Sequence, residues 1–175
     1  TPGDFMRAAV VPIGADHRSG DLREAERMLR ADPSLVDDFY AACAAGDVAA
    51  VRRHLARDAS LARSSGGPHG WPAICYATFS RFLRLELASR EADFEQLVRT
   101  LLEHGADANA SWTSDDPWGP TRETALYGAA GIANSEAVTR VLLEAGASPE
   151  LPDGETLYHV AEHRDHRCLK LVLPH

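Results

Sequence analysis

The chain has 175 residues, a formal net charge of −8 and 45% hydrophobic residues. This length suits about one domain, and the apolar stretches are far shorter than the roughly 20 residues of a membrane-spanning helix, so we expect no membrane partner. The acidic balance also opposes nucleic-acid binding, because phosphate contacts need a basic surface.

The three cysteines occur singly, at Cys43, Cys75 and Cys168, without the paired spacing of a disulfide framework. The N-terminal residues show no basic segment followed by an apolar one, so no secretory signal is expected. These features predict a cytoplasmic protein in a reducing compartment. Lys170 is the only lysine, which together with the alanine content favours a bacterial coding sequence.

The N-terminal part of the chain contains an internal sequence repeat. Residues 20–35 match residues 46–61, and in both copies the apolar residues step by three and four positions, as on one face of a helix. Asp21 and Asp47 precede these helices, where a carboxylate accepts hydrogen bonds from the first free amide groups. The match predicts a short loop followed by a helix in each copy.

A second repetition lies further along the chain. Residues 98–109 and 139–150 share Arg, Leu-Leu-Glu and Gly-Ala at equivalent positions. Each copy predicts an amphipathic helix that stops at Gly105 or Gly146, because the residue after a helix end often needs a positive φ. Units that recur every 20 to 50 residues are typical of stacked-repeat proteins, in which neighbouring units share one core.

Residues 124–130 match residues 156–162, and each segment precedes one of the later helices. Here the chain resembles the ankyrin repeat, through Gly-Glu-Thr-Leu-Tyr-His-Val-Ala at residues 154–161 and Leu-Leu-Glu-His-Gly-Ala-Asp-Ala-Asn at residues 101–109. The resemblance implies one all-α domain over residues 1–175, an ankyrin-like solenoid of about five stacked helix-turn-helix units, with strands limited to short hairpins at turn tips. The expected units are residues 5–35, a divergent N-terminal unit, and residues 37–61, 72–109, 124–150 and 156–173.

Two segments exceed the regular unit. The first, within residues 81–94, is expected to form a longer helix or an added loop. The second, residues 110–122, is too polar to form a core. Long polar insertions on a rigid scaffold are where binding residues tend to lie.

The candidate binding residues lie mainly in these connections. All three tryptophans fall between the predicted units, and tryptophan is enriched at interaction hot spots. Acidic residues beside them make residues 110–122 an aromatic and acidic finger. The alternative is that each tryptophan folds back over the edge of the stack and seals it. The candidates are His69, Trp71, Arg81, Trp112, Asp115, Asp116, Trp118, Arg122 and Tyr127.

A metal site and an enzyme active site are two alternative interpretations of the remaining residues. His159 and His163 are spaced to share a helix face, with His166 and Cys168 close by. The resemblance instead implies that His159 is a structural histidine bonded to neighbouring backbone, so we expect no metal and no cofactor. No phosphate loop or nucleophile elbow is present, so catalysis is not the favoured interpretation.

The sequence therefore predicts a module that binds another protein through a concave groove and inter-repeat fingers. The acidic finger favours a partner segment that is basic or carries arginine. The alternative function is a small-molecule-binding or catalytic protein, which a deep pocket holding His69, Tyr76 and Arg81 together would support. A third interpretation is a segment of a larger polypeptide, because the last helix lacks a polar terminal cap.

Overall fold

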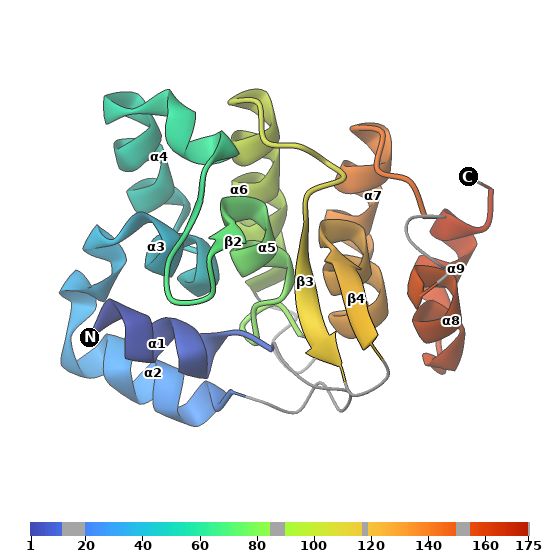
Figure 1. The fold of residues 1–175 in the computed structure, drawn as a ribbon, viewed down its shortest axis with the longest axis horizontal. Coiled ribbons are helices and arrows are strands. Elements are labelled where there is room, and N and C mark those ends of the chain that lie inside the picture. Colours follow the sequence, from blue (N-terminus) through green and yellow to red (C-terminus); the bar gives the residue numbers. More distant parts are fainter. Residues whose placement is uncertain (12–19, 85–89, 117–118, 150–154, 175) are drawn as a thin grey trace.

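The computed structural model describes residues 1–11, 20–84, 90–116, 119–149 and 155–174. Within these ranges the chain is mostly helical, with two short antiparallel hairpins (Figure 1). The helices are α1 (Pro2–Ala9), α2 (Leu22–Ala31), α3 (Phe39–Ala45), α4 (Val48–Arg57), α5 (Ala73–Thr78), α6 (Glu91–Glu103), α7 (Glu136–Glu144), α8 (Glu155–Glu162) and α9 (Arg167–Val172). Shorter turns of helix are η1 (Pro33–Asp37), η2 (Ala59–Arg63) and the π-helical η4 (Tyr127–Ile132), and the strands are β1 (Ser65–Gly66), β2 (Trp71–Pro72), β3 (Ser111–Asp116) and β4 (Gly119–Thr124). None of the described helices is long and apolar enough to cross a lipid bilayer.

The helices pack in two adjacent rows. In the first row α1, α3, α5, η4 and α8 contact one another in that order, and in the second row α4, α6, α7 and α9 do the same. Each helix of the second row also packs against the first-row helix that precedes it in the chain, while α2 packs on α1 and η1. The prediction of an α-rich chain is therefore confirmed.

Residue size explains how the rows fit together. Beside its buried aromatic rings, the first row buries many alanines, whose small side chains let neighbouring backbones approach closely, and alanine is also the strongest helix former. The second row contributes larger aliphatic side chains at the spacing of one helical face. The fully buried alanines of the first row are Ala9, Ala41, Ala42, Ala44, Ala73, Ala77, Ala129 and Ala130. The second row buries Val51, Leu55, Leu97, Leu101, Val138 and Leu142.

The similarity between residues 20–35 and 46–61 is also a structural similarity. Asp21 and Asp47 precede α2 and α4, and each side chain accepts a hydrogen bond from a backbone N–H in the first turn, at 3.2 and 2.8 Å. These contacts confirm the predicted N-caps. Each helix is then followed by a 3₁₀ turn, η1 or η2, which the sequence analysis did not predict.

The predicted glycine ends of α6 and α7 are confirmed. Gly105 and Gly146 have φ angles of +90° and +89°, a region that glycine reaches without a Cβ clash. In both copies the following alanine donates its N–H to a carbonyl in the last turn of the helix, at 3.0 and 2.9 Å. Asn109 then joins the two units, because its side chain donates to the Gly146 carbonyl at 3.1 Å and accepts from the Ser148 N–H at 2.8 Å.

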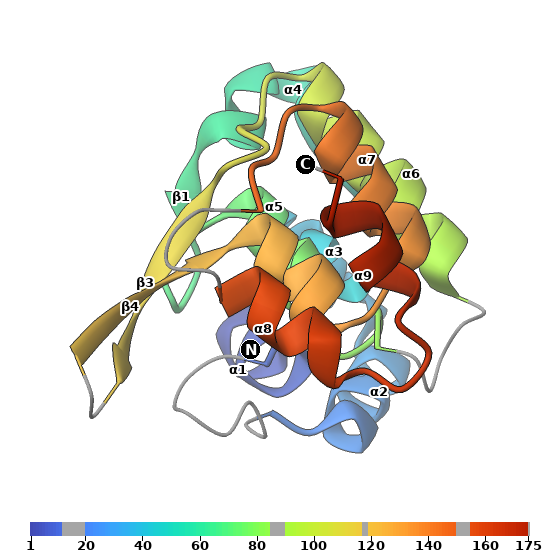
Figure 2. The same cartoon turned by 90° about the vertical axis from the view of Figure 1, so that its right-hand side faces the viewer.

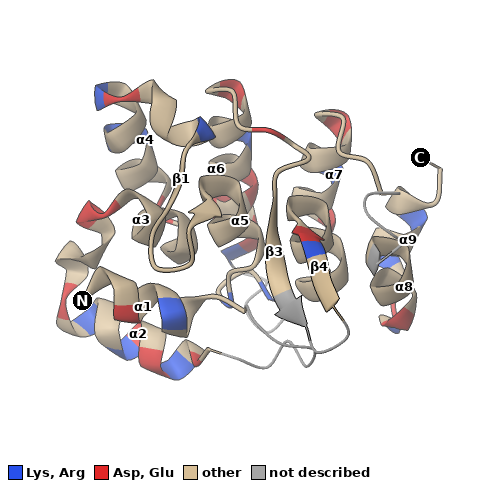
Figure 3. Cartoon of the chain, in the orientation of Figure 1, with Lys and Arg blue, Asp and Glu red and all other residues tan. Residues whose placement is uncertain are grey.

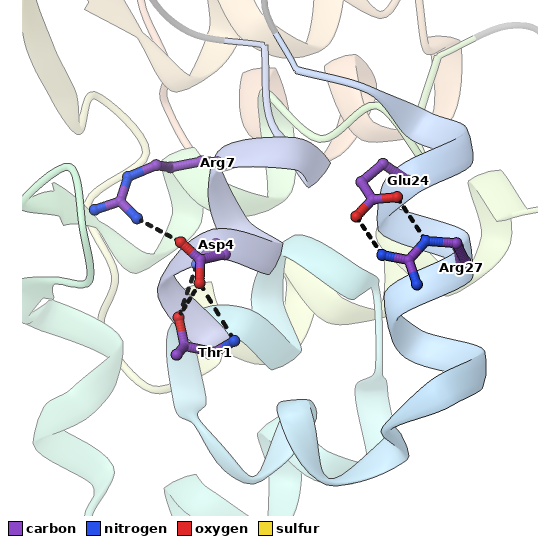
Figure 4. Close-up of polar contacts among 5 residues, drawn as sticks. All are labelled: Thr1, Asp4, Arg7, Glu24 and Arg27. Atoms are coloured by element: carbon purple, nitrogen blue, oxygen red, sulfur yellow. Dashed lines mark hydrogen bonds and ion pairs between the residues drawn. The ribbon is translucent and has the colours of Figure 1, made fainter.

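The N-terminal helices are fixed at their ends by local polar contacts. At the start of α1 the Thr1 hydroxyl accepts a hydrogen bond from the Asp4 N–H at 3.2 Å and donates to the Asp4 carboxylate at 2.6 Å (Figure 4). On α2, Glu24 and Arg27 form an ion pair with two hydrogen bonds, at 2.6 and 2.7 Å. These groups are exposed, so each contact stabilises its helix end only slightly.

The two insertions take different forms. α6 begins at Glu91 and has 13 residues where α7 has 9, so the first insertion partly extends a helix; residues 85–89 lie outside the described residues. The second insertion, expected as a polar loop, instead contains strands β3 and β4. Cross-strand hydrogen bonds satisfy the backbone, so a polar segment can gain regular structure here without forming a core of its own.

Candidate functional site

The two hairpins lie side by side, with β2 next to β3. Figure 2 shows the β3–β4 hairpin extending well beyond the helices. We use the name hairpin face for residues 62–72, 105–116 and 119–124. Most of the candidate binding residues from the sequence analysis fall within this surface.

Tyr76 of α5 holds the first hairpin in place. Its hydroxyl donates to the Gly66 carbonyl at 2.9 Å and accepts from the His69 N–H at 3.1 Å. Burial raises the pKa of Tyr76 to about 12, so the hydroxyl remains protonated and able to donate. A second tyrosine, Tyr40 of α3, shares a hydrogen bond of 2.7 Å with the Ser64 hydroxyl. Hydrogen bonds from two first-row helices, α3 and α5, therefore fix the position of the β1–β2 hairpin.

Trp71 and Trp112 join the two hairpins. Their rings stack with centroids 4.3 Å apart, and the His69 ring stacks on Trp71 at 4.7 Å. Trp71 is 4% exposed and Trp112 is 9% exposed. The expectation that these two rings are exposed anchors is wrong, because stacking against each other and against the body of the protein removes them from solvent. They fold back and seal the stack, as in the alternative interpretation.

Tyr127 is likewise an interior residue, at 2% exposure. Its ring lies 6.0 Å from Phe79 and 5.2 Å from His159, and Phe79 in turn lies 5.5 Å from Trp112. A continuous series of aromatic rings therefore runs along the first row. This position corrects the expected role of Tyr127 as a surface anchor.

His69 is half-buried beside Trp71. Burial lowers the pKa of His69 below its ordinary value of 6.5. The imidazole is therefore neutral at pH 7 and acts as a stacking partner, not as a cation. It remains the one aromatic candidate whose ring is partly open on the hairpin face, among the described residues.

The β3–β4 hairpin presents different side chains on its two faces. Trp112, Ser114 and Glu123 are buried, and the Ser114 hydroxyl donates to the Glu123 carboxylate at 3.2 Å. Thr113 and Arg122 are opposite each other across the strands and are exposed. Of the other predicted finger residues, Trp118 and the side chains of Asp115 and Asp116 lie outside the described residues.

A cavity of about 400 Å³ opens on the hairpin face between the two hairpins and the end of α6. Two arginines line it, Arg63 from the end of η2 and Arg122 from β4. The Nε of Arg122 donates to the Ser111 hydroxyl at 2.7 Å, which orients its guanidinium group. Arg122 is among the residues predicted from the sequence to bind a partner, and Arg63 is not. A basic residue just before a predicted turn is a weak signal, and only the fold shows which cavity it lines.

Arg81 is not part of this site. Its N–H donates to the Ala9 carbonyl at 2.8 Å, next to the β-bridge between Val10 and Ser80. Arg81 therefore lies against the end of α1, while His69 and Tyr76 lie on the hairpin side. None of four cavities in the described part of the chain is lined by these three residues together, so the shared pocket that a catalytic interpretation needs finds no support.

The enzyme and metal alternatives gain no support from the remaining candidates. Burial raises the pKa of the Cys75 thiol, which is the opposite of the activation that a nucleophilic cysteine needs. His163 bonds the Gly131 carbonyl at 2.7 Å, and Cys168 lies 3.5 Å from the Thr139 hydroxyl. Within the part of the chain that the structure describes, no group of three or more histidine, cysteine or acidic residues is arranged to hold a metal ion.

A second cavity, of about 450 Å³, lies away from the hairpin face and involves α2, η1, α4 and α6. One side is closed by Arg90, whose guanidinium donates to the Ala45 carbonyl at 2.7 Å and pairs with Asp93 at 3.3 Å. Arg90, the arginine of this cavity, is thus already bound to acceptors of the protein itself. None of the residues predicted as binding residues lines this cavity.

Comparisons of this chain with protein-family models, with curated proteins and with solved structures found no match in any of the three.

Proposed function

We propose that this chain is an ankyrin-like repeat module that binds another protein through the hairpin face. The observation that carries the proposal is the β3–β4 hairpin, which extends beyond the helices and is exposed at Thr113 and Arg122. Polar, exposed loops on a packed scaffold commonly carry binding function.

The repeated structure supports the ankyrin-like part of this proposal. Helices pair along the chain, second-row helices end at Gly105 and Gly146, and Asn109 links one unit to the next. The hairpins occupy the connections between pairs. Units that share a core with their neighbours are the hallmark of a stacked-repeat architecture.

The interior of the hairpin face supports the binding part. The stack of His69, Trp71 and Trp112 and the hydroxyl of Tyr76 fix both hairpins to the helices. A preorganised surface loses less conformational entropy on binding than a flexible loop does. The aromatic residues therefore support the binding surface from beneath, and the exposed polar residues contact the partner.

We place this interaction in the cytoplasm. Cys43, Cys75 and Cys168 are buried free thiols, and proteins with unpaired buried cysteines are typical of reducing compartments.

Site-specific photo-crosslinking tests the proposal. A photoreactive phenylalanine analogue replaces Thr113 on the hairpin face or, as a control, Arg52 on the exposed side of α4. In cells of the organism that encodes the chain, we expect one polypeptide to be crosslinked at position 113 and not at position 52. Identical products at both positions, or no polypeptide at position 113, would contradict the proposal.

A further inference from the structure

We propose that the cavity between Arg63 and Arg122 binds carboxylate side chains of an acidic segment of the partner polypeptide. This inference rests on the proposed function and specifies the chemistry of the partner. It reverses the charge expected from the sequence, where Asp115 and Asp116 favoured a basic segment.

The two guanidinium groups are available for a ligand. Arg63 forms no hydrogen bond or ion pair with any described residue, and the one such contact of Arg122 uses its Nε. The two terminal nitrogens of Arg122 are thus open in the described part of the chain. A guanidinium group binds a carboxylate through two parallel hydrogen bonds, which gives both strength and orientation.

Two polar neighbours of these arginines, Asp107 and Asn109, already have partners. Asp107, the acidic residue in the described lining of the cavity, accepts a hydrogen bond from the Asn109 N–H at 2.8 Å. The Asn109 side chain is committed at both ends to the next unit, at Gly146 and Ser148. The terminal nitrogens of the two arginines, together with the Ser65 hydroxyl, are therefore donors of the lining without an acceptor among the described residues, and a ligand can supply acceptors.

Many other arginines of this acidic chain are neutralised by the protein itself. Figure 3 shows acidic and basic segments mixed over the helices. Ion pairs occupy Arg7, Arg27, Arg30, Arg90, Arg99, Arg140 and Arg167. On α4, Arg52 and Arg53 have no ion pair with a described residue but lie on an exposed helix surface. Arg63 and Arg122 differ because separate elements bring them to one cavity.

The rest of the lining suits an acidic amino-acid side chain. Ala62, Pro72 and Ile74 supply apolar walls, and Ser65 and Ser111 supply hydroxyl groups. The methylene groups of glutamate can contact the apolar walls while its carboxylate reaches a guanidinium group. A cavity of about 400 Å³ beside an exposed hairpin accommodates side chains of an extended segment.

The test uses synthetic peptides and the whole chain. The probe is a peptide of alternating glutamate and glycine, compared with glutamine and lysine versions of the same length. Nuclear magnetic resonance follows the arginine Nε–Hε signals, and fluorescence anisotropy gives the dissociation constant. We expect the glutamate peptide to shift the Arg63 and Arg122 signals and the glutamine peptide to leave them unchanged.

Arginine-to-glutamine variants in the cavity and on α4 provide the comparison. Each of Arg63→Gln and Arg122→Gln should weaken binding of the glutamate peptide about tenfold. The double variant Arg52→Gln/Arg53→Gln should bind it like the parent chain. All four positions are exposed, and circular dichroism verifies that each variant is folded.

Several results would overturn the inference. They are unchanged Arg63 and Arg122 signals, equal effects of the α4 variants, and tighter binding of the lysine peptide. Succinate that binds as tightly as the peptide would assign the cavity to a free small carboxylate and also overturn it. Crosslinking of a polypeptide at position 113 together with any of these results would leave the proposed function standing without this inference.

Discussion

The hydroxyl of Tyr76 connects a buried helix to the first hairpin. It makes one hydrogen bond to the Gly66 carbonyl and one to the His69 N–H, while the ring itself is fully buried. Removing the hydroxyl leaves the ring packing intact and deprives the hairpin of both bonds. Replacing Tyr76 with phenylalanine therefore isolates the contribution of these two hydrogen bonds to stability.

We predict that Tyr76→Phe lowers the free energy of unfolding by about 1–2 kcal/mol. Urea denaturation followed by circular dichroism measures the loss. Tyr158→Phe is the matched control, because Tyr158 is 64% exposed and should change stability by less than about 0.5 kcal/mol. Equal losses in the two variants would show that the Tyr76 hydroxyl does not hold the hairpin.

The Asp165 carboxylate makes stability depend on acid pH. Hydrogen bonds, first from the Asn134 side chain at 3.0 Å and also from Arg167, lower the pKa of Asp165 to about 2. Because the pKa is lowered, the contribution of Asp165 to the free energy of unfolding is complete above the ordinary aspartate pKa of 3.8. It is lost as the pH falls through about 2.

We therefore expect Asp165→Asn to be less stable than the parent chain at pH 7, with a difference that narrows below about pH 4. Thermal denaturation at several pH values measures this difference. Asp37→Asn, at an exposed position, serves as the control. A difference between Asp165→Asn and the parent chain that stays constant from pH 7 to pH 2 would exclude the titration of Asp165 as its cause.

The tryptophans show what a sequence cannot decide for a single residue. Trp71 and Trp112 lie in connections, as the sequence shows, but tryptophan has the same composition signal in a binding site and in a packed interior. The two tryptophans stack on each other although they are far apart in the sequence. Arg63 was missed for the related reason that its neighbour in the cavity, Arg122, is distant in sequence.

At the scale of elements, the ends of helices were the most predictable feature. Asp21 and Asp47 cap the first turns of α2 and α4. Gly105 and Gly146 end α6 and α7. Each of these signals is local in the sequence. The β3–β4 hairpin was expected as a loop, because its strands are short and polar and their pairing depends on contacts across the turn. Periodicity alone does not reveal such pairing.

Replacing the glycine that ends α7 tests the role of this helix stop. Apart from the residues adjacent in the chain, no atom of the described residues lies within 4 Å of the Cβ that an alanine would place at Gly146, so the cost of Gly146→Ala arises from its φ of +89°. We predict a loss of about 1 kcal/mol in the free energy of unfolding. Gly146→Asn should lose less, because asparagine tolerates positive φ better. Urea denaturation compares the variants, and a neutral Gly146→Ala would contradict this explanation.

At the scale of the whole molecule, the packed core and the proposed binding surface lie in different parts of the structure. Two rows of helices share a core of alanine and aliphatic residues, and aromatic rings fasten the hairpins to the first row. The hairpin face is exposed at Arg63, Thr113 and Arg122. A partner can therefore bind the hairpins without rearranging the helices.

Amide hydrogen exchange of the chain alone and with the polypeptide crosslinked at position 113 tests this account most directly. The account predicts slower exchange in residues 62–72 and 111–124 when the partner is bound, with exchange in α4, α6, α7 and α9 unchanged. Slower exchange in those second-row helices, with the hairpins unaffected, would contradict it and place the binding surface on the opposite side of the molecule.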